Sequence, residues 1–583
     1  MPSKYELYRS ADAPVPEKTW IWNMYGAGVE NIGCNGRPER FPISEPGPDQ
    51  LLVRLDAVGM CFSDVKLIKQ GGQHPKLYRR DLARHPTRLG HEAAMTVIKV
   101  GENLKNRYGP GQRLAIQPDI YDAAGKSTAY GYTIPGGLTQ YHLIGPEVLN
   151  VNGQTYVLPI GGELGYAETA LTEPWACVEA AYTQRRRLTP EVGGTMWIVG
   201  RPGDARVYRF SEGLDRPALI VLTDAPPSVQ RLVKKQLEQR QVTVVERNDL
   251  SPAGYSALKT ELTGGVGFDD IVVLDPRSAE AVGEASKLIA RRGTFNLVGQ
   301  MPLDGPAPVD VSRIHYDYTA YVGNPGPDIV VSYGEARNRC DLRPGGVAVF
   351  VGAGGPMGQM HVQRAIELPN GPGQIIATDI NEMRLAALAD RFSALAEANH
   401  TRLLTFNPAA AGENLYDFVK RTTHQRGADD VIVSVPVAAV MAEAATLMTP
   451  DGMLVFFAGV PNGTLAPLDL SQVYLHNAQY TGTSGSALPD QAMVIQKTLA
   501  HKLSPNRSVA AVGGIEAARD GIEAMMKGRF PGKVVIFPQL SGLPLTGVDE
   551  LAAGLPDIAA QLAPGNVWTA AAEQSLIERF WQL

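Results

Sequence analysis

The sequence predicts an α/β protein with a β-rich N-terminal domain and two doubly wound parallel-sheet domains. Three observations predict this class. Up to about residue 190, short apolar runs alternate with glycine and proline, as in β strands joined by turns. From residue 191, apolar strands alternate with amphipathic helices, which indicates a parallel sheet. From residue 341 the same series begins again, and the length of 583 residues suits several domains better than one.

We expect a β-rich domain over residues 1–190. The runs LLVRLDAVGM, AAMTVIKVGE and GQRLAIQPDI are its clearest strands.

An internal repeat covers the two sheet domains, which we place at residues 191–340 and 341–500. The stretch GFDDIVVLDPRSAEAVGEASKLIARRGTFNLVGQMP corresponds to GADDVIVSVPVAAVMAEAATLMTPDGMLVFFAGVPN, and VDVSRIHYDYTAYVGNPGPD corresponds to LDLSQVYLHNAQYTGTSGSALPD. A match of this length and order indicates duplication.

The tail, residues 501–583, returns to mixed elements. RFPGKVVIFPQL is expected to form a strand near the surface, and NVWTAAAEQSLIERFWQL an amphipathic helix.

Composition excludes several functions. The net charge of −6 argues against a general nucleic-acid or anionic-membrane surface, which needs surplus Lys and Arg. The four cysteines are far apart, so no disulfide framework is expected. No signal peptide and no apolar run of about 18 residues is visible, so a cytoplasmic protein is expected.

The second copy contains a candidate phosphate-binding loop. Its glycines come after a strand and precede a helix, where backbone N–H groups can approach a pyrophosphate. An acidic residue ends the next strand and would accept hydrogen bonds from a ribose hydroxyl while repelling a 2′-phosphate, which favours NAD(H) over NADP(H). The alternative is a strand–helix turn that binds nothing. The candidate cofactor residues are Gly352, Gly354, Gly355, Pro356, Met357, Gly358, Asp379 and Arg384.

The first copy has GRPGDARVYRF at the equivalent place. Gly200 and Gly203 remain, but Arg201, Pro202 and Asp204 crowd and charge the turn. We expect this copy to have lost dinucleotide binding and to serve structure or assembly, the alternative being a retained regulatory nucleotide site.

The N-terminal domain contains candidate metal ligands. Cys61, His91, Glu92 and Glu173 offer sulfur, nitrogen and oxygen donors, which suit a tetrahedral zinc ion with an open position. Singly, each residue has an ordinary structural interpretation, such as a buried thiol or a hydrogen-bonded histidine.

These residues lie in motifs that resemble the medium-chain dehydrogenase/reductase superfamily, in its zinc alcohol and polyol dehydrogenase group. The motifs are GMCFSDVKLI, LGHEAAMTVIKVGENL with GPGQRL, GGLTQYHLI, TEPWACVEAAY, VGAGGPMG with ATDINEMRL, and GMLVFFAG. Within the superfamily, GGQHPKLYRRDLARHPTRLGHE and YTGTSGSALPDQAM are similar to ketose-phosphate reductases. The resemblance implies a GroES-like catalytic domain, a Rossmann domain and a tail that returns to the catalytic domain, with the first Rossmann copy as a degenerate insertion.

The resemblance also implies roles for individual residues. Cys61 and His91 would bind one catalytic zinc, with Glu92 and Glu173 supplying carboxylates, one of them through water. Ser63 would hydrogen-bond the substrate oxygen and pass its proton on. Lys66 stands where many relatives have a relay histidine. The implied reaction is hydride transfer between NAD(H) and a polyol, sugar or sugar phosphate.

Three further points remain open. Candidates for a cationic phosphate pocket are His74, Lys76, Arg79 and Arg80, which could equally lie on a solvated loop. The chain could form a homo-oligomer, or its two Rossmann copies could form an intrachain pseudo-dimer with heterologous rather than two-fold contacts. The alternative functions are a zinc-free enone or quinone reductase and a non-catalytic nucleotide-sensing or assembly protein.

Overall fold

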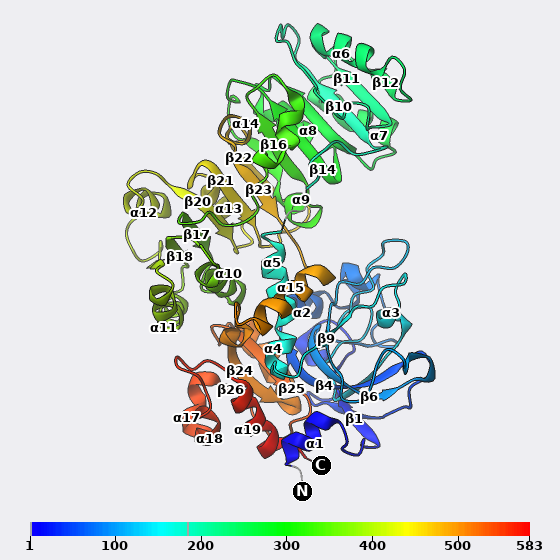
Figure 1. Ribbon diagram of the computed structural model, residues 1–583, viewed down its shortest axis with the longest axis vertical. Helices are drawn as coiled ribbons and strands as arrows, with labels where there is room; N and C mark the ends of the chain where they lie inside the picture. Colours follow the sequence, from blue (N-terminus) through cyan, green and yellow to red (C-terminus); the bar gives the residue numbers. More distant parts are fainter. Residues whose placement is uncertain (1–2, 184–185, 583) are drawn as a thin grey trace. The chain divides into compact units, whose positions relative to one another are not determined.

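The computed structural model describes residues 3–183 and 186–582 (Figure 1). The chain divides into two compact units. The first unit combines the chain up to residue 180 with residues 355–360 and 485–583, and the second contains residues 181–354 and 361–484. Among the described residues, none of the helices has the length and apolar character needed to cross a membrane.

The first unit is built on an eight-stranded sheet with the order β26-β24-β25-β4-β6-β7-β9, in which β8 also pairs with β4. The strands are β4 (Leu51–Gly59), β6 (Glu92–Val100), β7 (Arg113–Ile116), β8 (Tyr141–Ile144), β9 (Val157–Ile160), β24 (Val509–Gly514), β25 (Lys533–Phe537) and β26 (Thr546–Gly547). Two small pairs accompany it: β1 (Lys18–Ile21) with β3 (Glu39–Pro42), and β2 (Asn23–Met24) with β5 (Thr87–Arg88).

The C-terminal strand corrects one expectation. The segment KVVIF was expected near the surface, but all five residues of β25 are buried. This strand pairs with β24 and β4 and therefore lies inside the sheet (Figure 1). Its pairing partner β4 belongs to the N-terminal part of the chain, so local sequence could not reveal the burial.

Short helices surround this sheet. They are α1 (Lys4–Ser10), α2 (Phe62–Gln70), α3 (Pro146–Leu149), α4 (Tyr166–Ala170), α5 (Thr172–Ala180), α15 (Leu488–Leu499), α16 (Ala518–Met526), α17 (Leu551–Gly554), α18 (Pro556–Ala559) and α19 (Ala570–Phe580). A 3₁₀ turn, η3 (Pro75–Leu77), lies between α2 and β6.

The second unit is built on one twelve-stranded sheet with the order β12-β11-β10-β13-β14-β16-β23-β21-β20-β17-β18-β19. The first repeat supplies β10 (Thr195–Val199), β11 (Leu219–Thr223), β12 (Thr243–Glu246), β13 (Phe268–Leu274), β14 (Ile289–Val298) and β16 (Ala320–Asn324). The second supplies β17 (Val347–Val351), β18 (Gln374–Thr378), β19 (Arg402–Phe406), β20 (Ala428–Val433), β21 (Met448–Phe456) and β23 (Gln479–Gly482). Within each repeat all pairs are parallel, as expected for strands connected by crossover helices.

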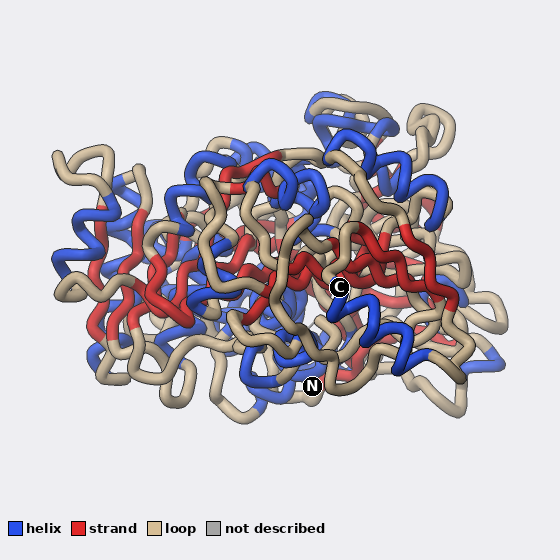
Figure 2. Tube along the Cα trace, turned by 90° about the horizontal axis from the view of Figure 1, so that it is seen from above, coloured by secondary structure: helices blue, strands red, loops and turns tan. Residues whose placement is uncertain are grey.

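Helices lie on both sides of rows of strands, as Figure 2 shows with helices in blue and strands in red. The helices of this unit are α6 (Pro227–Leu237), α7 (Tyr255–Thr263), α8 (Ala279–Ser286), α9 (Val311–Tyr316), α11 (Glu382–Ala398), α12 (Leu415–Thr422), α13 (Ala438–Ala445) and α14 (Ser471–His476). The helix α10 (Pro356–Glu367) is shared, because its residues 356–360 belong to the first unit and the rest to the second. Strands β17 and β20 are buried at every residue. Burial on both faces explains the continuous apolar sequence of β17, whereas β20 contains two buried aspartates, Asp429 and Asp430, that pair with arginines.

The two repeats join edge to edge through equivalent strands. β16 pairs antiparallel with β23, with Tyr321 opposite Tyr480. In the repeat alignment these two tyrosines are counterparts. A residue that pairs with its own counterpart lies on a pseudo-two-fold axis.

A second pair of equivalent strands has the same symmetry. β15 (Ala307–Asp310) pairs antiparallel with β22 (Leu465–Leu468), with Ala307 opposite Leu468 and Val309 opposite Ala466. In the repeat alignment Val309 is the counterpart of Leu468, and Ala307 is the counterpart of Ala466. A pseudo-two-fold rotation therefore converts each of these two pairings into the other. The prediction of heterologous contacts between the two copies is therefore wrong. Both copies use the same surface, so their contact has the form of an isologous, two-fold interface.

Candidate functional site

Three candidate metal ligands come together in the first unit. Cys61 precedes α2, and His91 and Glu92 lie at the start of β6. One ligand atom from each residue lies within 4.8 Å of the other two. The sheet brings them together because Gly59, at the end of β4, pairs with Glu92. A Cβ on Gly59 would lie 2.1 Å from Glu92 Oε2, so the glycine makes room for this carboxylate.

His91 is held on both sides of its ring. Its Nδ1 lies 3.2 Å from Asp64 Oδ1, and its Nε2 lies 3.3 Å from Ser63 Oγ. Burial lowers the pKa of His91, but the neighbouring Asp64 and Cys61 outweigh it and raise the pKa well above its usual value. Asp64 therefore orients the imidazole in the way that outer carboxylates orient metal-binding histidines.

Glu92 forms a buried ion pair that sequence reasoning missed. Lys533 Nζ lies 2.5 Å from Glu92 Oε1, and the side chains are 3% and 0% exposed. The other carboxylate oxygen, Glu92 Oε2, is buried without a hydrogen-bond partner among the described residues. A buried carboxylate oxygen beside a thiol and an imidazole fits a metal ion. The lysine at the start of the apolar strand KVVIF is a weak local trace of this pair. It becomes informative only once the strand is known to be buried, because buried lysines are nearly always paired.

Glu173 lies in α5 next to this group but outside it. Burial raises its pKa to about 7, His91 opposes the shift, and Glu92 and Asp119 add to it. Cys177 Sγ lies 3.8 Å from Glu173 Oε1. The structure thus distinguishes the two glutamates, with Glu92 in the compact donor set and Glu173 beside it.

The two remaining catalytic candidates differ in position. Ser63 lies in the first turn of α2 and contacts His91. Lys66 is exposed on the same helix. Its charge, with that of Lys76, adds to the effect of burial in lowering the pKa of His74 to about 4.

The glycine loop of the second repeat comes directly after β17. Gly352 has a φ of +80°, which favours glycine. The N–H of Gly354 donates to Asp379 Oδ2 at 3.0 Å. A Cβ on Gly354 would lie 2.8 Å from Asp379 Oδ2, just after β18, and 2.7 Å from Arg384 Cβ in α11, so only glycine lets this turn approach them. The structure therefore brings Gly352, Gly354, Asp379 and Arg384 together.

The remaining cofactor candidates follow Gly354 in the sequence and lead into α10. Gly355 precedes α10, and Pro356, Met357 and Gly358 form its first turn. This is the strand–turn–helix arrangement in which helix N–H groups bind phosphate.

The corresponding loop of the first repeat is built differently. Residues 200–218, between β10 and β11, contain no helix. Asp204 accepts hydrogen bonds from Tyr208 Oη at 2.8 Å and Arg206 N at 3.0 Å. Arg201 pairs with Asp275. This loop therefore lacks a helix N-terminus for a phosphate and places a carboxylate in the turn.

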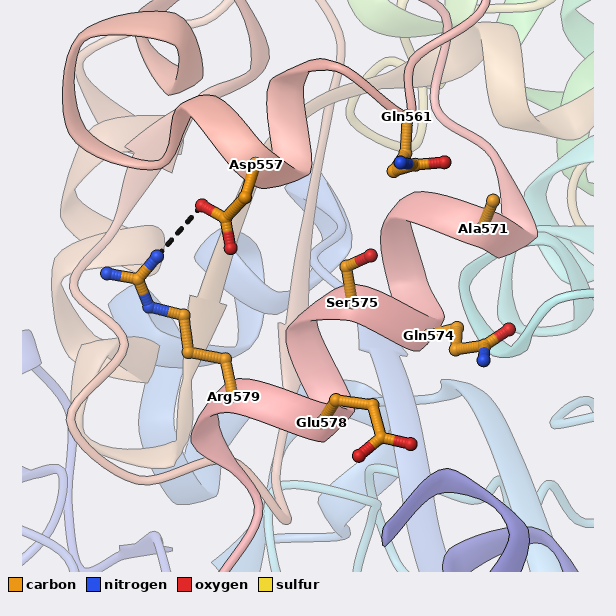
Figure 3. A pocket seen from close by; sticks show the side chains of 7 residues that line it. All are labelled: Asp557, Gln561, Ala571, Gln574, Ser575, Glu578 and Arg579. Carbon is orange, nitrogen blue, oxygen red and sulfur yellow. Dashed lines mark hydrogen bonds and ion pairs between the residues drawn. The ribbon is translucent and has the colours of Figure 1, made fainter. Parts of the chain in front are cut away.

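A separate surface hollow lies between α18 and α19 (Figure 3) and has a volume of about 480 Å³. Asp557 and Arg579 form an ion pair of 2.8 Å across it. The other lining side chains are Gln561, Ala571, Gln574, Ser575 and Glu578. With its one cation paired and no Cys or His in its lining, this hollow does not offer the chemistry of the Cys61 group.

A thiol, an imidazole and a carboxylate in a β-rich domain, together with a strand–glycine–helix loop, define the class of zinc-type alcohol dehydrogenases. Residues 47–179 match the model of the alcohol dehydrogenase GroES-like domain. The chain is 28% identical over 307 residues to L-sorbose 1-phosphate reductase of Klebsiella pneumoniae, covering 50% of this chain and 72% of that protein. It is 43% identical over 285 residues to a sorbitol dehydrogenase of Gallus gallus, covering 46% of this chain and 72% of that protein.

The chain belongs to the medium-chain dehydrogenase/reductase superfamily and is a dehydrogenase or reductase of the alcohol and polyol dehydrogenase type. The resemblance inferred from the motifs is thereby confirmed. A further relative is similar over almost the whole length: a mannitol-1-phosphate 5-dehydrogenase of Aliivibrio fischeri is 22% identical over 548 residues, covering 92% of this chain and 94% of that protein.

Proposed function

We propose that the protein is a zinc-dependent oxidoreductase that transfers hydride between NAD(H) and a polyol, sugar or sugar phosphate. The observation that carries the proposal is the group of Cys61, His91 and Glu92, whose ligand atoms lie within 4.8 Å of one another, with Ser63 in contact with His91. The named relatives, which include a sorbose phosphate reductase and sorbitol dehydrogenases, support the substrate class.

Cys61, His91 and Glu92 would hold the zinc ion, and Glu173 lies beside them. When bound, zinc supplies a Lewis acid that polarises a carbonyl or acidifies an alcohol. Three protein donors leave one position open, which is the donor count of a catalytic rather than a structural site.

The chain's own residues orient the reaction and carry the proton. Asp64 fixes the His91 ring from the Nδ1 side. Ser63 Oγ would relay the proton of the substrate hydroxyl during oxidation, accepting it while its own hydroxyl proton passes on toward solvent, and the same relay would run in reverse during reduction. Lys533 balances the charge of Glu92 inside the sheet.

The loop of the second repeat would bind the cofactor. Its glycines and the α10 N-terminus suit the pyrophosphate, and Asp379 suits a ribose with a free 2′-hydroxyl. NAD(H) supplies the hydride chemistry when bound. The first repeat, whose loop lacks both a helix start and an uncharged turn, would serve structure rather than cofactor binding.

Zinc content and turnover test the proposal together. We expect about one zinc per chain by elemental analysis and oxidation of NADH with ketoses or ketose phosphates. Cys61→Ala should remove zinc and activity together, whereas Cys34→Ala, at an exposed cysteine, should change neither. Turnover without zinc would favour the zinc-free reductase, and folded protein with neither zinc nor turnover would favour a nucleotide sensor.

A further inference from the structure

An ion pair lies near the proposed reaction site and has no part in the zinc or proton chemistry proposed for it. Lys76, in η3, places its Nζ 2.9 Å from Asp119 Oδ1 and 4.9 Å from the ring centroid of Tyr132. The side chains of Lys76 and Asp119 are 33% and 18% exposed. The pair is therefore ordered by its surroundings and still open to a ligand.

The backbone on both sides of the pair is held in place. Thr133 Oγ1 donates to the Lys76 carbonyl at 2.6 Å, and the Lys76 N–H donates to His74 Nδ1 at 3.2 Å. The Asp119 N–H donates to Gln117 Oε1 at 2.9 Å. Such anchoring is typical of a preorganised binding group rather than of a mobile surface lysine.

A glycine from a distant segment makes room for Asp119. Gly485 has a φ of +75°, and a Cβ at this position would lie 2.1 Å from Asp119 Oδ2. Any larger residue at position 485 would displace the Asp119 carboxylate. The position of Asp119 therefore depends on a residue that is far away in the sequence.

Tyr132 connects the pair with the candidate metal ligands. Its ring lies 5.8 Å from the His91 ring, measured between centroids. Burial raises the pKa of Tyr132, and the nearby charges of His91 and Lys76 oppose the shift. Asp119 is also near enough to Glu173 to contribute to the raised pKa of that residue. The pair therefore borders the place where Ser63 would meet the substrate oxygen.

The charges in this region favour a neutral ligand. Asp119 already balances the ammonium of Lys76, and the ammonium of Lys533 is paired with Glu92. A phosphate dianion that approached Lys76 would meet the carboxylate of Asp119 beside it. An ammonium next to a carboxylate instead offers donors and an acceptor together, which matches hydroxyl groups that both donate and accept.

Two other basic candidates of this segment, Arg79 and Arg80, do not add a phosphate-binding group beside Lys76. Arg80 donates to the carbonyls of Thr133 and Pro86, so its role is structural. Arg79 is exposed.

We infer that Lys76 and Asp119 form a subsite that binds a hydroxyl group next to the reacting carbon and selects a neutral polyhydroxylated substrate over its phosphate ester. This inference rests on the proposed function and names the substrate class of that same site.

The test compares three substrates in the NADH assay: a neutral ketohexose, the phosphate ester of the same ketose, and an alkanone without hydroxyl groups. Lys76→Met should lower kcat/KM for the neutral ketose by about tenfold to a hundredfold, the usual cost of a lost charged hydrogen bond, and leave the alkanone nearly unchanged. Lys76→Arg should recover part of the loss. Asp119→Asn should raise the preference for the phosphate ester over the neutral ketose, because it exposes the charge of Lys76.

Lys69→Met, at an exposed lysine of α2, is the matched control and should behave as the wild type. Circular dichroism and zinc content of each variant show whether it is folded. A loss confined to the phosphate ester in Lys76→Met, or an equal loss for all three substrates, would overturn the inference while the proposed function stands. No turnover of any substrate by the wild type would overturn both.

Discussion

At the scale of single residues, the two carboxylate oxygens of Glu92 have different surroundings. One of its oxygens pairs with Lys533, and the other lies buried beside Cys61 and His91 without a hydrogen bond among the described residues. Because a buried charge without a partner is costly, Lys533 and a metal ion would each make the position of Glu92 tolerable. The lysine therefore supports the metal ligands without being one.

Removing this lysine should destabilise the first unit. Lys533→Met leaves Glu92 buried without its counter-charge and should cost about 3 kcal/mol, within the range for broken buried ion pairs. The matched control is Lys527→Met, which removes an exposed pair with Glu523 and should cost about 0.5 kcal/mol or less. Urea unfolding of zinc-free protein measures both. Equal stability of the two variants would show that Lys533 is not needed to balance Glu92.

The sequence could predict the proximity of candidate residues that occur in short motifs, while their roles stay predictions. Cys61, His91 and Glu92 occur in two short motifs, and the structure brings their ligand atoms together. Lys533 could not be placed in the same way, because it reaches the group through a strand pairing between β25 and β4. Asp119 depends similarly on Gly485. Long-range contacts of this kind leave only a weak local trace, such as a lysine in an apolar strand.

At the scale of elements, the two glycine loops differ in the element that comes after the strand. In the second repeat α10 begins directly after the loop, whereas the first repeat has no helix over residues 200–218. Arg201, Pro202 and Asp204 led to the prediction that the first copy has lost dinucleotide binding, which stays a prediction, whereas the missing helix was not predicted. Without a helix N-terminus, the loop loses the donors and the positive potential that bind a phosphate.

We therefore expect one NADH per chain in isothermal titration calorimetry. Asp379→Asn should lower the affinity for NADH by about tenfold, which is comparable to the loss of a hydrogen bond to a charged group. It should lower the affinity for NADPH less. Asp224→Asn, at the matching end of β11, should leave NADH affinity unchanged. A stoichiometry of two, or an effect of Asp224→Asn on affinity, would show that the first repeat retains a site.

A buried histidine in α10 should make the second unit sensitive to acid. His361 is fully buried, its Nδ1 lies 2.7 Å from Tyr182 Oη, and its ring lies 4.2 Å from that of Phe457. Burial, with a smaller contribution from Arg364, lowers its pKa from 6.5 to about 3. The folded state therefore holds fewer protons than the unfolded state between these values. This contribution to stability is complete above pH 6.5 and is lost as the pH falls toward 3.

At pH 5 the loss from His361 should be about 2 kcal/mol relative to pH 7.5. Urea unfolding midpoints at the two pH values measure it, and His361→Asn should reduce the difference between them. His501→Asn, at an exposed histidine, serves as the control. An unchanged pH difference in His361→Asn would mean that other groups cause the acid sensitivity.

At the scale of the whole molecule, duplication has given one chain a twelve-stranded sheet with internal symmetry. The pairing of Tyr321 with its counterpart Tyr480, and the exchange of pairings between β15 and β22, place the pseudo-two-fold axis inside the second unit. Buried residues of both repeats, including Phe295 and Phe456, belong to one hydrophobic cluster. The sheet edges that equivalent domains would offer to each other are thus paired within the chain.

This junction should behave as part of the folded core and not as a subunit interface. Tyr480 is 3% exposed, and Tyr480→Arg would bury a charge beside Tyr321, so the thermal midpoint should fall by several degrees. The molar mass from light scattering should equal that of the wild type, because no separate chain is bound along this edge. Tyr416→Arg, at an exposed tyrosine of α12, should change neither quantity. A halved mass in Tyr480→Arg would show instead that β16 and β23 pair between chains, as in an exchanged dimer.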